Sequence, residues 1–318
     1  MRALVTGAAG FVGQWLCDGL VERGWDVFGA RLGEAIPPGR LDETHRDAVR
    51  WLACDVTSIA DLRATLDTSA PDAVFHLAGI AFVPAATADP GGALEVNVAA
   101  AARLLAEVAT RRATGTLDPI VLVVGSGEQY GRHAAEEQPL DERAEQRPLN
   151  LYAASKAAQE VVALASHRST GLRVIATRSF NHSGPGQATH FLIPALVQRA
   201  LALRGADAAL PLGNTSTIRD FLHVSDVVRA YIGLVEHGAA GEAYNVASGC
   251  GVTVMTVAER VLALAQVQAK LQVDPALARP VEVPALIGDA RKLRAATGWV
   301  PERSLDTIID DVIRATAH

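Results

Sequence analysis

The chain has 318 residues, of which 49% are hydrophobic, and a formal net charge of −6. This length suits one large α/β domain or two smaller ones, and the negative charge argues against a nucleic-acid-binding face. No apolar run is long enough to span a membrane, and the chain begins in a strand-like segment, so we expect no membrane span and no signal peptide. The scattered Cys17, Cys54 and Cys250 lack metal-ligand spacing and predict a reduced, cytoplasmic protein without a metal site.

Strand-like and helix-like segments alternate through the first 180 residues. Apolar runs predict strands at 2–6, 25–30, 49–56, 72–79, 119–125 and 172–179. Helical periodicity predicts helices at 11–24, 91–112 and 151–169. Such alternation is typical of βαβ units with right-handed crossovers, so we predict an α/β fold with a Rossmann-type, doubly wound parallel sheet.

The pattern loosens after about residue 180. The sequence predicts a Gly/Pro loop at 181–187, a helix at 190–203, and a strand at 218 onward that leads into a helix beginning near Ser225 or Asp226. The Pro-punctuated segment 280–288 is expected to be extended or looped. We therefore predict a dinucleotide-binding Rossmann domain over residues 1–180 and a smaller α+β substrate lobe over residues 181–318, with some exchange of chain between the two.

The motif TGAAGFVG follows the first predicted strand and opens a helix. Its spacing allows a tight turn at Gly7, a close backbone approach to a pyrophosphate at Gly10 and close strand–helix packing at Gly13. The N–H groups of the helix start, at Phe11 and Val12, then face the anion. A plain turn is the alternative reading of three glycines, but the strand–turn–helix context favours a dinucleotide site.

The end of the second strand predicts which nicotinamide cofactor binds. Arg31 is the local candidate and no acid stands beside it, so we favour NADP(H), with NAD(H) also allowed. The alternative is an exposed arginine with no role. Asp55 and Val56, after the third strand, are candidates for contacts to the adenine, and a helix N-cap is the other reading of Asp55. We interpret His76, in the fourth strand, as a packed sheet histidine.

Three residues form a candidate catalytic group. Tyr152 and Lys156 are four residues apart on one predicted helix and therefore share a face. A nearby ammonium favours the phenolate, so we expect Lys156 to lower the pKa of Tyr152 and to make it usable as an acid or base. Ser126, at the end of the fifth strand, can hold the same substrate oxygen.

With these motifs, the HLAG tetrad and the EVNVAA segment, the chain resembles the extended short-chain dehydrogenase/reductase family nearly from end to end. The resemblance implies a nicotinamide cofactor that Leu77, Ala78 and Gly79 help to bind, and a contact between Lys156 and the nicotinamide ribose. It also implies that Asn97, in the cofactor-binding set, supports the active-site helix. An ordinary helix-surface asparagine is the alternative for Asn97.

The second half resembles enzymes of this family that act on nucleotide-activated sugars. The similar segments are 178–187, 213–231 and 279–301. By this resemblance Asn181 contacts the sugar or its diphosphate, and Arg219, Arg279 and Glu282 belong to the substrate site, where arginine can bind phosphate oxygens in a bidentate way. The alternatives are a structural pair between Arg219 and its neighbour Asp220, and a solvated Arg279.

The combination of FNHSGPGQ with RPVEVPALIG is similar to the GDP-4-keto-6-deoxy-mannose reductases, which form GDP-rhamnose, and to the related GDP-mannose 4,6-dehydratases. Glu128 is compatible with both. In a dehydratase a carboxylate here is the base that removes the C5 proton, whereas in a reductase it only binds substrate hydroxyls or a loop. Gly127 replaces the serine or aspartate that dehydratases tend to have, which favours the reductase, as does the short chain.

The sequence thus predicts an enzyme that reduces the C4 ketone of GDP-4-keto-6-deoxy-D-mannose to GDP-D-rhamnose with NADPH. Three alternatives stay open: a GDP-mannose 4,6-dehydratase with Glu128 as the base, a nucleotide-sugar 4-epimerase, and a dinucleotide-binding sensor without turnover. We further expect a homodimer formed through the helices at about 92–112 and 152–168, whose alanine-rich faces allow close approach, although the same faces also suit packing within one chain.

Overall fold

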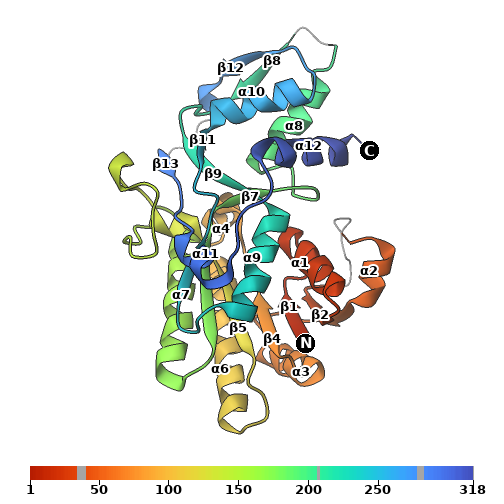
Figure 1. Ribbon diagram of the computed structural model, residues 1–318, viewed down its shortest axis with the longest axis vertical. Helices are drawn as coiled ribbons and strands as arrows, with labels where there is room; N and C mark the ends of the chain where they lie inside the picture. The colour runs from red at the N-terminus through yellow and green to blue at the C-terminus, as the bar shows by residue number, and fades with distance from the viewer. Residues whose placement is uncertain (34–40, 206–207, 278–282, 318) are drawn as a thin grey trace.

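The computed structural model describes the chain except for residues 34–40, 206–207, 278–282 and 318. A large parallel sheet occupies the lower part of the molecule, and a smaller lobe lies above it (Figure 1). Within the described residues this sheet has seven strands in the order β3-β2-β1-β4-β5-β6-β10. The strands are β1 Arg2–Thr6, β2 Asp26–Arg31, β3 Arg50–Ala53, β4 Ala73–His76, β5 Ile120–Ser126, β6 Val174–Ser179 and β10 Ala243–Val246. The strand order reverses between β1 and β4, and open α/β sheets bind ligands beside such a reversal.

Helices cover both faces of the sheet because successive residues of a strand point to opposite sides. Leu4 and Val74 pack against α3, α6 and α7, whereas Val5 and Phe75 pack in the core that contains α1 and α9. The helices up to β6 are α1 Phe11–Glu22, α2 Glu43–Ala48, α3 Ile59–Ser69, α4 Val83–Ala88, α5 Pro90–Leu94, α6 Ala100–Ala113 and α7 Leu151–Thr170. The Rossmann-type fold predicted from the sequence is confirmed.

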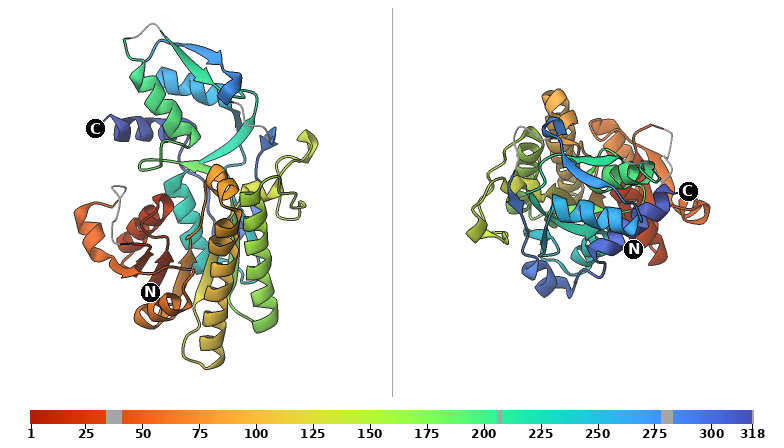
Figure 2. Two further views of the ribbon diagram at one scale, coloured as in Figure 1. Left: turned by 180° about the vertical axis from the view of Figure 1, so that it is seen from behind. Right: turned by 90° about the horizontal axis from the view of Figure 1, so that it is seen from above.

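Helix α7, which carries the candidate catalytic residues, has well-defined ends. The side chain of Asn150 accepts a hydrogen bond from the backbone N–H of Ala153 and caps the first turn. Gly171 ends the helix in the left-handed conformation, with a φ of 70°, which glycine adopts without steric cost. Figure 2 shows α7 lying beside α6 along the sheet, and the two helices are in contact.

The single helix predicted over residues 91–112 is interrupted. α5 ends at Leu94, a π-helical turn spans Glu95–Ala99, and α6 begins at Ala100. Such turns often mark functional sites because they turn a side chain out of helical register. Here the turn contains Asn97, which is fully buried. The alternative reading of Asn97 as a surface residue is therefore wrong.

The lobe is built from the part of the chain that follows residue 180. Its strands are β7 Asn181–Ser183, β8 Ala209–Leu212, β9 Ile218–His223, β11 Gly251–Thr253, β12 Lys270–Val273 and β13 Ala285–Leu286. β9 pairs with β7, β11 and β13, and β8 pairs with β12. The helices of this part are α8 Leu192–Ala202, α9 Val224–His237, α10 Val254–Leu264, α11 Arg291–Thr297 and α12 Leu305–Thr316. A separate apolar core joins α8, α10 and α12 through residues such as Leu196, Val261 and Ile309.

Parts of the C-terminal segment return to the large sheet. β10 pairs in parallel with β6, and α9 packs against α1. The predicted boundary at residue 180 therefore divides the sequence but not the two cores, and the division into a cofactor domain and a substrate domain stays a prediction.

Two local predictions in this half are wrong. Residues 181–183 of the predicted Gly/Pro loop form β7, because they pair with β9. Helix α9 is capped by His223, whose Nδ1 accepts a hydrogen bond from the backbone N–H of Ser225, and not by Ser225 or Asp226.

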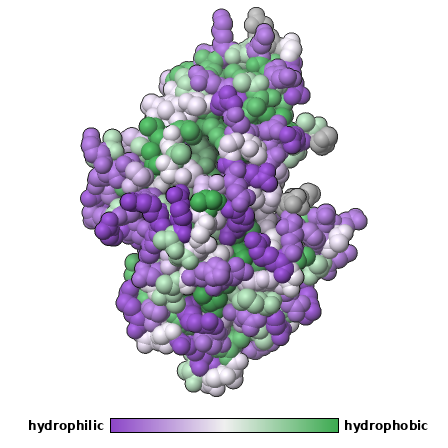
Figure 3. All heavy atoms as spheres, in the orientation of Figure 1, coloured by the Kyte–Doolittle hydropathy of each residue, from purple (hydrophilic) through white to green (hydrophobic). Residues whose placement is uncertain are grey.

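The surface is mixed in character. Hydrophilic residues cover most of the face seen in Figure 3, and apolar atoms show between them, many over the upper lobe. Among the described residues, no helix is both long and apolar enough to cross a membrane, and no cluster of three or more His, Cys, Asp or Glu side chains could hold a metal ion. Cys17 and Cys54 are buried free thiols, and Cys250 is an exposed one.

Candidate active site

The turn between β1 and α1 is packed so tightly that it needs its glycines. Gly7 has a φ of +71°, and a Cβ atom there would lie 2.8 Å from the backbone nitrogen of Ala78. A Cβ at Gly13 would lie 2.2 Å from the carbonyl oxygen of Gly7, and one at Gly10 would lie 3.2 Å from the same oxygen. The start of α1 is thereby pressed against the end of β1, as a dinucleotide-binding turn requires.

The N-terminus of α1 suits a pyrophosphate. Gly10 is the N-cap residue and offers no side chain to the first turn, so the N–H groups of Phe11, Val12 and Gly13 begin the helix without a side-chain cap. Aligned N–H groups together with the helix dipole attract an anion. The Phe11 ring also stacks on His182 of the lobe at 6.3 Å between centroids, which ties this turn to β7.

We expect Gly13→Ala to destabilise the fold by about 1–3 kcal/mol, because its Cβ meets only backbone atoms that cannot move without shifting α1. NADPH affinity should fall with it. Gly19→Ala is the matched control in the same helix, since its Cβ meets side-chain atoms at 3.2 Å or more and alanine favours helix formation. Thermal unfolding and NADPH titration check this; equal melting temperatures for both variants would contradict it.

The adenosine side of the predicted cofactor site lies at the ends of β2 and β3. Arg31 ends β2, its Nη1 donates to the carbonyl of Gly33, and its buried Nε has no hydrogen-bond partner among the described residues. Oδ1 of Asp55 accepts from the backbone N–H and the hydroxyl of Thr57, which lowers the pKa of Asp55. The N-cap of α3 is Ser58, so the helix-cap reading of Asp55 is wrong. Val56 lies beside it and is buried.

The end of β4 forms the opposite wall. His76 is fully buried, and its Nδ1 shares a hydrogen bond of 2.8 Å with the hydroxyl of Thr6. Burial, followed by the charge of Lys156, lowers the pKa of His76 to about 3, so the ring is neutral. The backbone N–H groups of Leu77 and Ala78 donate to Thr6. As predicted, His76 is a packed sheet histidine.

Asn97 joins the end of β4 to α7. Its Oδ1 accepts from the backbone N–H of Ile80 at 2.7 Å, and its Nδ2 donates to the carbonyl of Ile80 and to the hydroxyl of Ser155. A Cβ at Gly79 would lie 2.9 Å from that Oδ1 and 3.4 Å from Nζ of Lys156. Asn97 therefore holds the exposed Gly79 segment beside the catalytic helix, and acts on the cofactor wall through Ile80.

The three candidate catalytic side chains come together at the carboxyl end of β5. Ser126 ends that strand, and its hydroxyl lies near enough to the Tyr152 hydroxyl to lower the pKa of Tyr152. Nζ of Lys156 donates to the carbonyl of Val124 at 2.8 Å and to Oε1 of Gln159 at 3.0 Å. An ammonium has three N–H donors, and these two bonds leave one for a ribose hydroxyl.

The pKa of Tyr152 differs from the sequence prediction. Burial, opposed by the hydrogen bond from Ser126 and reinforced by the charge of Glu128, raises the pKa of Tyr152 to about 12. Burial lowers the pKa of Lys156 to about 8. The expected lowering of the Tyr152 pKa by Lys156 is therefore wrong in this structure, because the loss of water dominates and Lys156 is not among the groups that shift this pKa. Tyr152 is a neutral phenol at pH 7, which suits a proton donor.

The predicted substrate residues lie partly within the described chain. Asn181 begins β7, and its buried Nδ2 has no partner among the described residues. Nη1 of Arg219 donates to the carbonyls of Ile218 and Val283. The alternative pair of Arg219 with Asp220 is wrong, because the Asp220 carboxylate accepts from the residues around it in a separate turn. Those donors are Ser248, Gly249 and Gly288. Arg279 and Glu282 lie outside the described residues.

Comparison with known proteins shows the family to which the chain belongs. Residues 4–312 match the model of the family described as GDP-mannose 4,6 dehydratase. The chain is 35% identical over 316 residues to a GDP-6-deoxy-D-mannose reductase of Pseudomonas aeruginosa, and the match covers 98% of this chain and 96% of the relative. The chain belongs to the GDP-mannose 4,6-dehydratase family.

Solved structures of related proteins have the same fold. The fold is similar to RMD from Pseudomonas aeruginosa complexed with NADPH, with a TM-score of 0.81 and 32% identity over 99% of this chain and 98% of that chain. It is also similar to a UDP-glucose 4-epimerase of Thermus thermophilus in complex with NAD, with a TM-score of 0.85 and 26% identity over 100% and 99% of the two chains. The predicted membership of the extended short-chain dehydrogenase/reductases, with NAD(P)-dependent chemistry on nucleotide sugars, is confirmed.

Gly127 is the position that the sequence analysis used to separate a reductase from a dehydratase. A Cβ there would lie 3.1–3.2 Å from the ring of Phe180, so that ring would have to shift by a few tenths of an ångström to admit a larger residue. Glu128 is half-buried, and its backbone N–H donates to the hydroxyl of Ser126. The site thus keeps one carboxylate near Tyr152, and a serine or aspartate beside it would press on Phe180.

Sequence reasoning missed three buried residues next to this site. Gln129, Glu160 and Arg178 are at most 6% exposed and join β5, α7 and β6. One signal could have identified them: Arg178 lies in the apolar run VIATRS, and a charge in a buried strand requires a partner.

Proposed function

We propose that this protein is an NADPH-dependent reductase of the C4 ketone of a nucleotide-linked 4-keto-6-deoxy sugar, converting GDP-4-keto-6-deoxy-D-mannose to GDP-D-rhamnose. The observation that carries the proposal is the Tyr152 hydroxyl, which is held protonated beside Ser126 at the carboxyl end of the sheet. Reduction of a ketone needs a proton donor at its oxygen. The relative from Pseudomonas aeruginosa, named a GDP-6-deoxy-D-mannose reductase, supports the choice of sugar.

Each residue of the site has a separate role in the proposed reduction. NADPH, when bound along the glycine turn, supplies the hydride to C4 of the sugar. Tyr152 donates its phenolic proton to the C4 oxygen, and the Ser126 hydroxyl donates a hydrogen bond to the same atom as negative charge develops on it. The ammonium of Lys156, held by the carbonyl of Val124 and by Gln159, would use its third N–H to hold the cofactor ribose. The product is the alcohol, and Tyr152 regains its proton from water.

The substrate lies between the sheet and the lobe. The unpartnered Nδ2 of Asn181 is a donor for the sugar or the diphosphate, because a buried amide without a partner is costly. Arg219, whose Nη1 is anchored on two backbone carbonyls, would bind phosphate oxygens through its guanidinium. Arg279 and Glu282 are included in the substrate-binding set by resemblance alone. These are proposals for the substrate-binding set.

Arg31 makes the site prefer NADPH. Its buried Nε lacks a partner among the described residues, and a phosphate on the adenosine ribose would supply one.

We expect Arg31→Ala to raise the KM for NADPH about tenfold and to leave the KM for NADH nearly unchanged, as loss of one charged hydrogen bond implies. Arg50→Ala is the control, because Arg50 lies at the amino end of the neighbouring strand β3, opposite Phe28 and not opposite Arg31. Equal changes for both cofactors would contradict this role. Asp55 keeps Oδ2 for the adenine amino group.

The test of the reaction is a pair of incubations. With GDP-4-keto-6-deoxy-mannose and NADPH we expect NADPH to be consumed, and with GDP-mannose and NADP⁺ we expect no keto sugar. Glu128→Gln should keep most of the reductase activity, since the reduction needs no base at C5. Formation of keto sugar from GDP-mannose, and its loss in Glu128→Gln, would instead show a dehydratase.

Assembly and location are part of the proposal. We infer a cytoplasmic homodimer formed through α6 and α7. Val161 on α7 is 59% exposed, which favours a partner on that face, whereas Ala100, Ala101 and Ala153 are buried within the chain. These three alanines therefore pack inside the subunit. Light scattering of the wild type and of Val161→Glu checks this, and a wild-type monomer would contradict it.

A further inference from the structure

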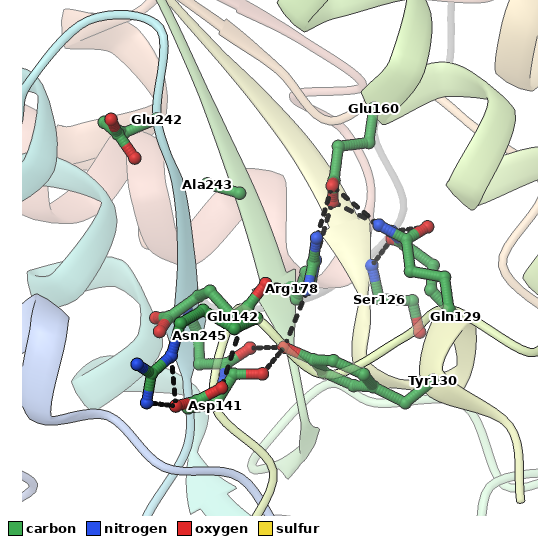
Figure 4. Close-up of polar contacts among 12 residues, drawn as sticks. Ser126, Gln129, Tyr130, Asp141, Glu142, Glu160, Arg178, Glu242, Ala243 and Asn245 are labelled. Carbon is green, nitrogen blue, oxygen red and sulfur yellow. Dashed lines mark hydrogen bonds and ion pairs between the residues drawn. The ribbon is translucent and has the colours of Figure 1, made fainter.

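A buried polar network lies directly behind the Ser126 turn (Figure 4). Gln129 is fully buried, and Glu160 and Arg178 are 4% and 6% exposed. Nε and Nη2 of Arg178 donate to the two carboxylate oxygens of Glu160 at 2.9 and 2.6 Å. This bidentate pair is rigid, because both partners are fixed in one geometry.

The network determines how Gln129 is oriented. Nε2 of Gln129 donates to Oε2 of Glu160 at 2.9 Å, which leaves Oε1 to accept from the backbone N–H of Ser126 at 2.7 Å. A carboxylate can only accept, so Glu160 selects the amide orientation in which Gln129 presents its oxygen to Ser126. Ser126 in turn accepts from the N–H of Glu128 through its hydroxyl, which closes a capping box around the turn.

The network also joins the elements that must meet at the substrate. Glu160 lies on α7, the helix that carries Tyr152, and Arg178 lies on β6, the neighbour of β5. Ser126 and Tyr152 come from different elements, yet their hydroxyls must reach one oxygen. The network therefore links Ser126 to the helix of Tyr152 by hydrogen bonds.

Arg178 is held on its other side as well. Its Nη1 donates to the hydroxyl of Tyr130 at 2.9 Å, and its Cζ lies 4.9 Å from the centroid of that ring. The Tyr130 hydroxyl donates to Oδ1 of Asn245 on β10. Arg178 thus has contacts on two sides, so it can hold Glu160 in place.

We propose that Gln129, Glu160 and Arg178 are positioning residues: they set the place of the Ser126 hydroxyl and the Glu128 carboxylate relative to Tyr152. This inference rests on the proposed function in its kinetic part only, because the position of Ser126 can be observed directly. Misplacement of a reacting group by about 1 Å lowers rates by up to about 100-fold.

The first variant is Gln129→Leu, which keeps the volume and leaves the Glu160–Arg178 pair intact. We expect kcat for NADPH oxidation to fall about 10- to 100-fold while the Kd for NADPH stays unchanged. Glu160→Gln is the second variant and should lower kcat in the same way. Glu107→Gln is the matched control: Glu107 is 7% exposed and pairs with Arg63 and Arg111 far from the site, so it should lose stability but not kcat.

A double-mutant cycle separates positioning from general destabilisation. If Gln129 acts through Ser126, Gln129→Leu will have little further effect on kcat in the Ser126→Ala background. Independent, multiplicative losses in kcat would overturn the proposal.

Crystal structures of the wild type, Gln129→Leu and Glu107→Gln supply a readout that needs no turnover. We expect the Ser126 hydroxyl to move away from the Tyr152 hydroxyl, relative to the wild type, only in Gln129→Leu. An unmoved Ser126 in that variant would overturn the positioning role. A wild type that does not oxidise NADPH, but whose Ser126 moves in Gln129→Leu, would contradict the proposed function and leave the positioning role supported.

Discussion

Tyr152→Phe is expected to lower kcat for NADPH oxidation about 10²- to 10⁴-fold, the usual contribution of a positioned general acid. The phenylalanine keeps the half-buried ring and removes only the hydroxyl that lies near Ser126. Without it, the oxygen formed on C4 must take its proton from water. Steady-state rates with GDP-4-keto-6-deoxy-mannose measure the loss.

The fold and the cofactor site should survive this change. Tyr152 lies on α7, whereas the glycine turn lies between β1 and α1, so the melting temperature and the Kd for NADPH should match those of the wild type. A Tyr152→Phe enzyme with normal turnover would show that another group, or water, protonates the product. The sensor alternative, which involves no turnover, would be favoured only if the wild type is equally inactive.

The rate of reduction is expected to fall as the pH rises through about 8. Burial lowers the pKa of Lys156 to about 8, so the ammonium is present at pH 7 and largely lost at pH 9. If only the charged form supports catalysis, kcat should be about tenfold lower at pH 9 than at pH 7. Tyr152, with a pKa of about 12, stays protonated over this range and should not contribute. A pH–rate profile measures this.

Lys156→Met is the control, because methionine has a similar length and no charge at any pH. Its kcat should be low throughout and should lack the fall near pH 8. The effect of Lys156 on the stability of the fold has the opposite pH dependence. The pKa of Lys156 is lower in the folded protein than in the unfolded chain. Its contribution to stability is therefore present at high pH and is lost as the pH falls through about 8. Lys156→Met should therefore melt at a higher temperature than the wild type at pH 7. A fall near pH 8 in both proteins would assign it to another group.

Much of this protein follows from local sequence. The six strands up to residue 179 and the helices that correspond to α1, α6 and α7 are visible in the apolar runs and the helical periodicity, because most of these parallel strands are buried on both faces. The helices α2, α3 and α4 were not predicted. The glycine turn and the Tyr152–Lys156 spacing are equally local, since a helix places residues four apart on one face. These features sufficed to predict the cofactor class and the catalytic group.

Tertiary structure decided the rest. The pKa of Tyr152 depends on how much water its neighbours exclude, and no spacing along the chain reports that. The tight space at Gly127 comes from Phe180, which is distant in the sequence. The orientation of Gln129 is determined by Glu160 and Arg178, which are brought together only when β5, α7 and β6 pack. Pattern along the sequence determines which elements form, whereas burial and long-range contacts determine the chemistry of the groups that those elements bring together.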